Sequence, residues 1–482
     1  MLNFKSFFIG ETFSLMSFRG MRPTCLAMAV SAFVAGCSSG PDYKTPSTPD
    51  PVGASFVSQP GSVDSNKMLP TQWWKLYQDP TLELLVEEAL KANTDLRVAL
   101  ANIDRSRAVY GEARSGQYPA TQVSAGVGYG RDQTSWSGTG QAPSQWHSTG
   151  GLDIAYEVDL FGRVRRDIEA AQYDADAVAA AYDATRLVVV AETTRSYVDA
   201  CAYGESMEIT QSSIELAQKN LSIISSQQQV GAASRLDVER AGLTLARTQA
   251  TLPLLRHQHD AALFELAALM GRTPSQIPDA AKVCTKAPEI AGKLPVGNGA
   301  NLLRRRPDVR QAERRLAADT ARIGVSVADL YPQITLGASV NYLRNDNLKG
   351  DRVWSFSLGP LISWSFPNTM VVRSHIAQAK AKSAASLASF HGTVLNALKE
   401  AEQSLSAYNA AMEQRDALIE ARNRAASAAS LADERYSGGS ISYLNVLVAQ
   451  ASLIDARAEV VASDQRVGAS RVSVFKALGG GW

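Results

Sequence analysis

The chain has 482 residues, of which 45% are hydrophobic and 20% are charged, and its formal net charge is +1 at pH 7. The near balance of 48 basic and 47 acidic residues argues against nucleic-acid binding and against broad attraction to an anionic membrane. After the N-terminus, no apolar run approaches the roughly 20 residues of a membrane-spanning helix, so a passage through a bilayer would have to use strands.

Residues 1–36 are predicted to be an export signal, with residues 1–20 interpreted as an upstream extension or a misassigned start. A basic start at Arg22 is followed by an apolar stretch and by small residues that lead to Cys37. This ending resembles a bacterial lipobox, which implies that Cys37 is lipidated and that Ser38 directs the chain to the outer membrane. The alternative is an ordinary cleaved signal with an incidental cysteine.

Residues 38–60 are rich in Ser, Pro, Gly and Asp, which predicts a flexible tether that leaves the membrane. The lipid-anchored tether as a whole is expected at residues 37–70. Export also implies an oxidising compartment. Cys201, in a long helical pattern, and Cys284, in a Pro-rich linker, are the cysteines that remain after Cys37. They could form a disulfide, or they could be two separately buried thiols.

The chain contains two copies of one plan, about 210 residues apart. The segment from Leu96 to Tyr129 matches the segment from Val309 to Tyr342, and the turn that starts at Gly231 matches the turn that starts at Gly439. We therefore expect two structural repeats, at residues 71–270 and 307–478. An equatorial linker at 271–306 joins them, and residues 479–482 form a C-terminal tail.

Each copy begins with a polar helix, predicted at residues 93–116 and 307–330, which a Tyr-Pro pair ends. A strand hairpin follows, at residues 121–160 in the first copy and 334–366 in the second. Apolar and polar residues alternate along these strands, which predicts one apolar and one polar face. Each strand is about as long as the 9–11 residues that cross a bilayer when tilted. Aromatic residues lie near the strand ends, and the loops between paired strands are long and polar.

Two long helices complete each copy, at residues 163–270 and 372–478. No proline interrupts residues 163–229, and apolar residues step by three and four along the helices, as in a coiled coil. A helix of this length measures on the order of 100 Å, too long for one compact domain.

Four strands cannot close a barrel, and open strand edges do not survive in lipid. Three chains would supply twelve strands, enough for an aqueous bore. The predicted fold is therefore mainly α with a membrane β-barrel: a trimeric 12-strand barrel with four strands per chain, continued by a long α-helical barrel of antiparallel coiled coils.

Several short motifs in a fixed order identify a family resemblance. They are Trp73-Trp74, residues 156–163 (YEVDLFGR), 302–309 (LLRRRPDV), 312–317 (AERRLA) and 477–482 (ALGGGW). Together they resemble the outer-membrane factor lipoproteins of RND-type multidrug efflux systems, in the TolC-like or NodT family. The resemblance implies a homotrimer in the outer membrane that extends into the periplasm and works with a periplasmic adaptor protein and an inner-membrane RND-type transporter.

No catalytic or cofactor site is expected. The five histidines lack metal-ligand spacing, and His257 and His259 do not share a helix face. We find no phosphate-binding glycine loop and no nucleophile elbow. The three arginines at 304–306 are interpreted as a solvated or ion-paired cluster at a helix start.

The helix tips are the candidate functional sites. The resemblance implies a periplasmic gate at Tyr436, Leu444, Leu447 and Val448, and adaptor docking at Gly231, Ser234, Gly438 and Gly439. Where the family often has Asp-Ala-Gln, this chain has Val448-Ala449-Gln450, so an acidic ring at that level is in doubt. The alternative for Leu444 is simple coiled-coil packing. The second tip has an extra glycine and an apolar run, so we expect the second hairpin to move and the first to form the fixed wall.

The predicted function is passive conduction of drugs and toxic organic molecules from periplasm to exterior, as the outer-membrane channel of a tripartite pump. A type I protein-secretion duct would share this architecture. A purely structural periplasmic coiled coil is a third alternative, but it leaves four amphipathic strands of membrane length unexplained.

Overall fold

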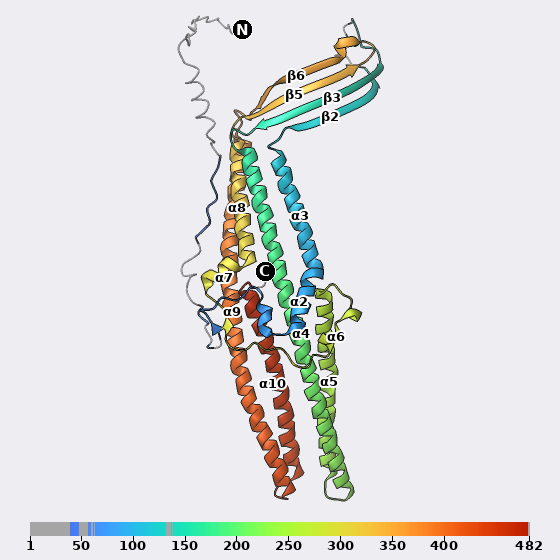
Figure 1. The fold of residues 1–482 in the computed structure, drawn as a ribbon, viewed down its shortest axis with the longest axis vertical. Helices are drawn as coiled ribbons and strands as arrows, with labels where there is room; N and C mark the ends of the chain where they lie inside the picture. The colour runs from blue at the N-terminus through green and yellow to red at the C-terminus, as the bar shows by residue number, and fades with distance from the viewer. Residues whose placement is uncertain are drawn as a thin grey trace, which may run out of the picture. The chain divides into compact units, whose positions relative to one another are not determined.

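The structure, a computed structural model, describes residues 39–47, 56–58, 61, 63–131, 136 and 138–480. Cys37 and the predicted signal lie outside these residues. The chain forms two compact units (Figure 1). The first holds Ser115–Asp167, Ile323–Ile376 and the N-terminal segment up to Pro41; the second holds Asp42–Arg114, Ile168–Arg322 and Ala377–Trp482. In the part of the chain described, every helix is too short or too polar to cross a membrane.

The first unit is built on a four-stranded antiparallel sheet in the order β2-β3-β5-β6. Its strands are β2 (Ala120–Gly130), β3 (Gln145–Val158), β5 (Gln333–Arg344) and β6 (Trp354–Ser363). The pairing of β3 with β5 joins the two sequence repeats in one sheet. Within the hairpin predicted at residues 121–160, apolar and polar residues alternate regularly only from Leu152, but Gln145–Gly151 also pair with β2 and belong to β3.

The strand register separates apolar from polar side chains. Neighbouring residues across the sheet form an apolar row, Val123, Leu152, Val340 and Phe356. The next row is polar: Gln122, Asp153, Ser339 and Ser357. Because successive side chains of a strand point to opposite faces, these rows lie on opposite faces of the sheet. Val123 is 78% exposed and Phe356 is 82% exposed, so the apolar face is uncovered in a single chain.

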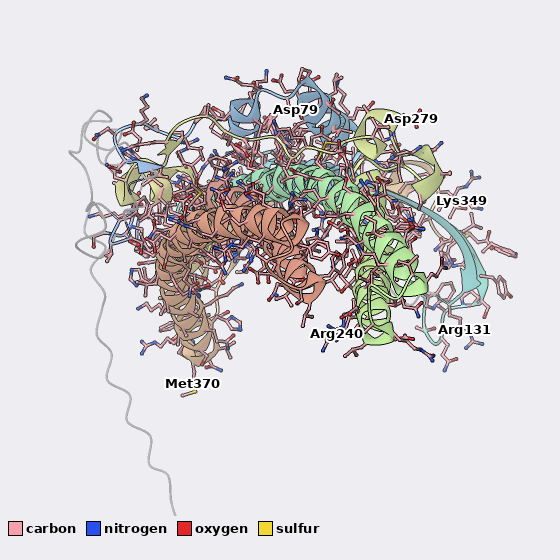
Figure 2. The ribbon with its side chains drawn as sticks, turned by 90° about the horizontal axis from the view of Figure 1, so that it is seen from below. Asp79, Arg131, Arg240, Asp279, Lys349 and Met370 are labelled. Carbon is pink, nitrogen blue, oxygen red and sulfur yellow. A yellow bond between two sulfur atoms is a disulfide. The ribbon has the colours of Figure 1, made fainter. Side chains whose placement is uncertain are left out.

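The long helices form two hairpins. The first consists of α4 (Arg163–Gln229) and α5 (Arg235–Leu269), and the second of α9 (Met370–Ser437) and α10 (Tyr443–Ala477). The shorter helices are α2 (Pro80–Ala92), α3 (Thr94–Ser115), α6 (Asp279–Lys282), α7 (Gly299–Arg305) and α8 (Pro307–Ala328). Short 3-10 helices lie at Trp73–Tyr77, Pro274–Gln276 and Gly350–Val353. Figure 2 shows the helix pairs nearly end-on, with Arg240 of α5 labelled.

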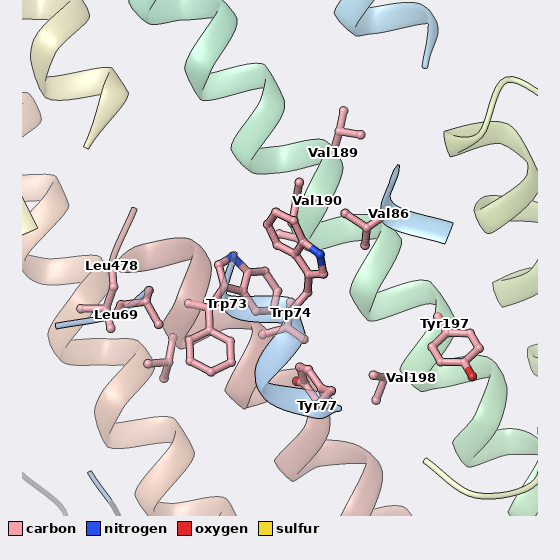
Figure 3. Close-up of a cluster of buried hydrophobic side chains, with 14 of the residues drawn as sticks. Leu69, Trp73, Trp74, Tyr77, Val86, Val189, Val190, Tyr197, Val198 and Leu478 are labelled. Carbon is pink, nitrogen blue, oxygen red and sulfur yellow. The ribbon is translucent and has the colours of Figure 1, made fainter. Parts of the chain in front are cut away.

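The core of the second unit gathers around Trp73, Trp74 and Tyr77, which are all buried (Figure 3). Trp73 Nε1 donates to Gly480 O at 3.1 Å, and its ring lies 4.7 Å from that of Phe475. A buried indole needs such a partner for its N–H. Trp73 thus attaches the N-terminal part of this unit to the end of α10.

The arginine cluster also holds the end of α10. Arg306 is 8% exposed and donates to Ala477 O at 3.0 Å. It pairs with Asp308 at 2.7 Å and with Glu400 of α9 at 2.8 Å. A nearly buried cation needs carboxylate partners of this kind. The interpretation as an ion-paired cluster is therefore confirmed for Arg306.

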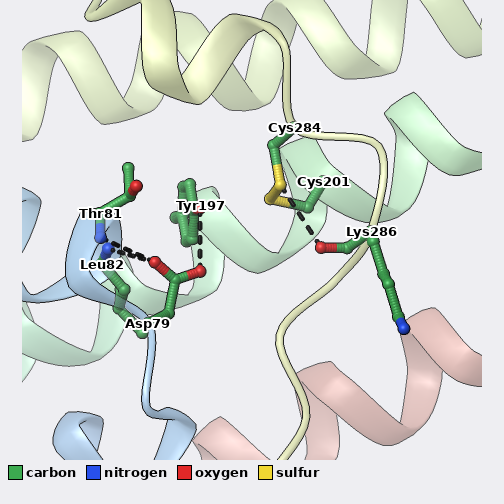
Figure 4. The surroundings of a disulfide bond; sticks show 7 residues. All are labelled: Asp79, Thr81, Leu82, Tyr197, Cys201, Cys284 and Lys286. Carbon is green, nitrogen blue, oxygen red and sulfur yellow. Dashed lines mark hydrogen bonds between the residues drawn. A yellow bond between two sulfur atoms is a disulfide. The ribbon is translucent and has the colours of Figure 1, made fainter.

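The linker between the repeats is attached to α4 by a disulfide. Cys201 and Cys284 are bonded, with their Cα atoms 4.7 Å apart (Figure 4). A Cβ atom on Gly204, one turn along α4, would lie 2.2 Å from Cys284 O. The backbone of the linker therefore crosses α4 at the glycine that interrupts its sequence pattern. Nearby, Asp79 caps α2 by accepting from Thr81 N and Leu82 N, and it also accepts from Tyr197 Oη at 3.0 Å.

The described residues of the segment 37–70 contact the second unit at several points. Tyr43 donates to Glu313 at 3.0 Å, and the backbone N–H groups of residues 57 and 58 donate to Glu402 at 2.7 and 2.9 Å. Strand β1 (Val63–Asp64) pairs with β4 (Leu294–Pro295). The composition is polar, but single apolar residues such as Phe56, which is 5% exposed, give the segment places to pack.

A charged network joins α8 to α9. Asp319 accepts from Ser386 Oγ at 2.6 Å and from Arg322 at 2.7 Å, and Lys382 Nζ lies 3.5 Å away. Arg322 also pairs with Asp174 of α4. Burial alone would raise the pKa of Asp319, but the hydrogen bonds and the two cations outweigh it and lower that pKa.

Candidate functional site

Both helix hairpins turn at a glycine with a left-handed backbone. Gly231 has φ +81° and Gly439 has φ +69°. After them, Ala232 N donates to Gln227 O at 2.8 Å and Ser440 N donates to Arg435 O at 2.9 Å. These bonds satisfy carbonyl groups at the helix ends, and glycine adopts this conformation without strain. The two predicted tips are therefore equivalent turns.

The starts of α5 and α10 differ. Ser234 and Asp237 form a capping box: Asp237 N donates to Ser234 Oγ at 3.2 Å, and Asp237 Oδ2 accepts from Ser234 N at 3.2 Å. The hydrogen bond from the Ser234 side chain lowers the pKa of Asp237. In the second copy, Asn445 replaces the acid and its amide donates to Ser442 Oγ at 3.1 Å. The Ser442 side chain then makes no capping bond to the helix backbone.

Tyr436, at the end of α9, contacts the first hairpin. Its hydroxyl donates to Gln227 Oε1 of α4 at 3.0 Å. Its ring lies edge-on to that of Tyr443, with 5.1 Å between ring centroids. Burial raises the pKa of Tyr443, and Tyr436 and Asp433 add to the effect. This predicted gate residue thus connects the two hairpins within one chain.

Leu447 lies in a small apolar cluster with Ile224 of α4 and Ala241 of α5. Leu447 is 8% exposed and Ile224 is fully buried. The other two predicted gate residues are placed differently: Leu444 is half-buried, whereas Val448 is 58% exposed. The cluster therefore includes Leu447 but not Val448.

Polar partners at the tips were missed by the sequence analysis. Asn220 of α4 donates to the side-chain oxygen of Gln450 on α10, and Gln450 Nε2 donates to Asp433 Oδ1 at 3.4 Å. Asp433 is thus an acidic residue that contacts Gln450, two residues after Val448, and Val448 stands where the family often has an aspartate. In the sequence, the one signal for polar contacts at this end of α4 is the run of three glutamines at 227–229.

The tips hold hydrogen-bonding groups and a small apolar cluster that join the two hairpins. Among the residues that the structure describes, no three His, Cys, Asp or Glu side chains are placed to hold a metal ion.

Comparison with known proteins identifies the family of the chain. A family model described as "Outer membrane efflux protein" matches the chain twice, at residues 85–272 and 299–480. The chain belongs to the outer membrane efflux protein family. The two matches correspond to the two halves of the internal repeat. This outer membrane efflux protein is accordingly an outer-membrane channel component, with a TolC-like fold made of two family repeats.

Relatives of this outer membrane efflux protein align along nearly its whole length. It is 30% identical to nodulation protein T of Rhizobium leguminosarum bv. viciae, over 95% of this chain and 93% of the relative. It is also 30% identical to the solvent efflux pump outer membrane protein SrpC of Pseudomonas putida, over 96% of this chain and 99% of the relative.

Solved structures share the fold. The outer-membrane channel OprN superposes with a TM-score of 0.85 and 32% identity, covering 92% of this chain and all of OprN. A membrane protein from Pseudomonas aeruginosa gives a TM-score of 0.80 with 26% identity, over 92% of this chain and all of the other. The fold of each unit is thus that of an efflux channel.

Proposed function

We propose that three copies of this chain form a passive duct through the outer membrane, for small toxic organic molecules, with a gate at the helix tips. The sheet carries this proposal. Its strands have 10 to 14 residues, enough to span a bilayer when tilted. Its register gives one apolar face for lipid and one polar face for water.

The sheet of a single chain has β2 and β6 at its two ends, each paired on one side among the described residues. Lipid cannot satisfy the other side, so another copy must pair with each end strand. Three copies give twelve strands, which leave room for water, whereas eight would be filled by side chains. Cross-linking in native membranes tests this assembly, and a dominant species other than a trimer would contradict it.

Contacts between the hairpins support a gate. Tyr436, Leu447 and Gln450 attach the second hairpin to α4 of the first. The start of α10 lacks the capping box that stabilises the start of α5, so the second hairpin is the one we expect to move. Apolar residues near a constriction, Leu444 among them, would disfavour water and ions.

The remaining partners follow from this role. Cys37 would carry the lipid anchor in the outer membrane. The exposed turns at Gly231, Ser234, Gly438 and Gly439 would receive a periplasmic adaptor, and an inner-membrane RND-type transporter would supply the energy. The chain itself would perform no catalysis and hold no cofactor.

Conductance in planar bilayers tests the gate. Replacing Tyr436 and Leu444 with alanine should raise single-channel conductance, because the side chains that close the tips are shortened. A matched pair of alanine substitutions at the exposed Val230 and Leu236, on the first tip, should have little effect. Equal conductance of the wild type and the Tyr436/Leu444 variant would reject the gate.

A further inference from the structure

Two aromatic pairs lie at the loop end of the sheet, where β2 is joined to β3 and β5 to β6. Tyr129 is paired with Trp146, and their ring centroids are 5.5 Å apart. Tyr342 is paired with Trp354, with 5.1 Å between centroids. All four lie on the apolar face, because each is an even number of residues along its strand from a member of the apolar row. Aromatic rings placed in this way mark the boundary between acyl chains and headgroups.

An arginine follows the tyrosine of each pair. Arg131 comes two residues after Tyr129, and Arg344 comes two residues after Tyr342. Because side chains of a strand alternate between its faces, each arginine shares the face of its tyrosine and lies nearer the loops. The two positions correspond in the sequence repeats, since the segment that ends at Tyr129 matches the one that ends at Tyr342. Each chain therefore carries the same aromatic and basic arrangement twice.

The second copy has a further arginine. Arg352 comes two residues before Trp354, and continuing the register of β5 and β6 places it opposite Arg344. Both arginines are exposed. Like charges directly opposite each other on neighbouring strands repel, and an anion bound between them removes the repulsion.

The described part of the chain does not supply this anion. Arg131, labelled in Figure 2, donates to Ser144 Oγ at 3.1 Å and to Gln141 Oε1 at 2.7 Å, and both partners are uncharged. Asp346 and Asp351 are exposed in the loop between β5 and β6. Among the described residues, however, no carboxylate forms an ion pair with any of the three arginines. Their charges are available to an external anion.

We propose that this end of the sheet binds a phosphorylated glycolipid of the outer leaflet, lipopolysaccharide, through its phosphate groups. The proposal rests on the membrane barrel of the proposed function, whose strand loops face the exterior. A guanidinium group binds two phosphate oxygens at once, which suits Arg131, Arg344 and Arg352. The acyl chains of the same molecule would cover the apolar face next to these arginines, where Phe356 is 82% exposed. One amphiphilic ligand thus satisfies both the charges and the apolar surface, which a free phosphate would leave bare.

Binding of lipid A to the purified full chain in detergent tests the site, with the Kd measured by thermophoresis. The variant is Arg344→Gln with Arg352→Gln, which removes two charges and keeps polar side chains. The matched control is Arg165→Gln with Arg373→Gln, which removes two charges from exposed positions at the helix end of the same unit. Arg131→Gln tests the first copy separately, and circular dichroism shows whether each variant is folded.

We expect the Kd for lipid A to rise at least about tenfold in Arg344→Gln/Arg352→Gln and to stay unchanged in the control, because charge-assisted hydrogen bonds to phosphate are lost. The same Kd in this folded variant as in the wild type would overturn the site. Phosphatidylglycerol and inorganic phosphate serve as competitors, and neither should displace lipid A at equal concentration. Displacement by phosphatidylglycerol would overturn the choice of a glycolipid, and displacement by inorganic phosphate would overturn a lipid site altogether.

Conductance in planar bilayers, measured on the same preparations, separates this proposal from the duct. A chain that conducts but does not bind lipid A would overturn the glycolipid site alone. A chain that does not conduct, but whose lipid A binding depends on Arg344 and Arg352, would overturn the duct and support the site.

Discussion

Replacing Tyr436 by phenylalanine removes the hydroxyl that donates to Gln227 Oε1 at 3.0 Å. The ring, and with it the edge-on contact to Tyr443, stays in place. A hydrogen bond between half-buried neutral side chains contributes about 1 kcal/mol. If the three chains of the proposed trimer open together, the closed state loses about 3 kcal/mol, which shifts the equilibrium toward the open tips roughly 100-fold.

Single-channel recording in planar bilayers measures this shift as open-state occupancy. Tyr203→Phe is the matched control, because no hydrogen bond of its hydroxyl is present among the described contacts. Gln227→Met should raise the occupancy as Tyr436→Phe does, and the double variant should add nothing further, since both remove the same bond. Unchanged occupancy in Tyr436→Phe, or full additivity of the two changes, would refute the reasoning.

Three further outcomes concern stability. Replacing Cys201 and Cys284 together by alanine should lower the free energy of unfolding by about 2–4 kcal/mol, measured by denaturant titration, since the bond closes a long loop. Gly204→Ala should hinder oxidation of that pair, counted by thiol titration, whereas Gly242→Ala, with open space around it, should not. The lowered pKa of Asp319 means that its contribution to stability is present above the ordinary aspartate pKa and is lost as the pH falls through the lowered value. In a plot of the free energy of unfolding against pH, Asp319→Asn should therefore reduce the loss of stability on the acid side. The same loss in the variant as in the wild type would contradict this.

The regular elements could be predicted because their signals are local. The helix predicted from Arg163 to about Gln229 has these bounds in the structure. A heptad pattern free of proline, with glycines just outside both ends, was sufficient even though Gly204 interrupts it. The first half of β3 was not predictable in this way. Polar residues and the pair Gly150-Gly151 break its alternation, and it is a strand because β2 lies beside it.

The tips were predictable only in part. Gly231 and Gly439 indicated the turns, since their conformation follows from their own lack of a side chain. The partners Gln227 and Gln450 depend on contacts between helices that are about 200 residues apart in the chain, and no spacing rule reports such contacts. The contacts of the N-terminal segment were not predictable for a similar reason, because composition describes solubility and not the fit of Gly40 against Gly324.

The different caps at Ser234 and Ser442 show what a doubled chain makes possible. If the ring were made of six identical single-repeat chains from one gene, each mutation would change all six tips. With two units in one gene, the first tip has Asp237 where the second has Asn445. Three alternating tips of the proposed assembly can therefore differ in their helix caps from the other three, which is what the proposed gate requires.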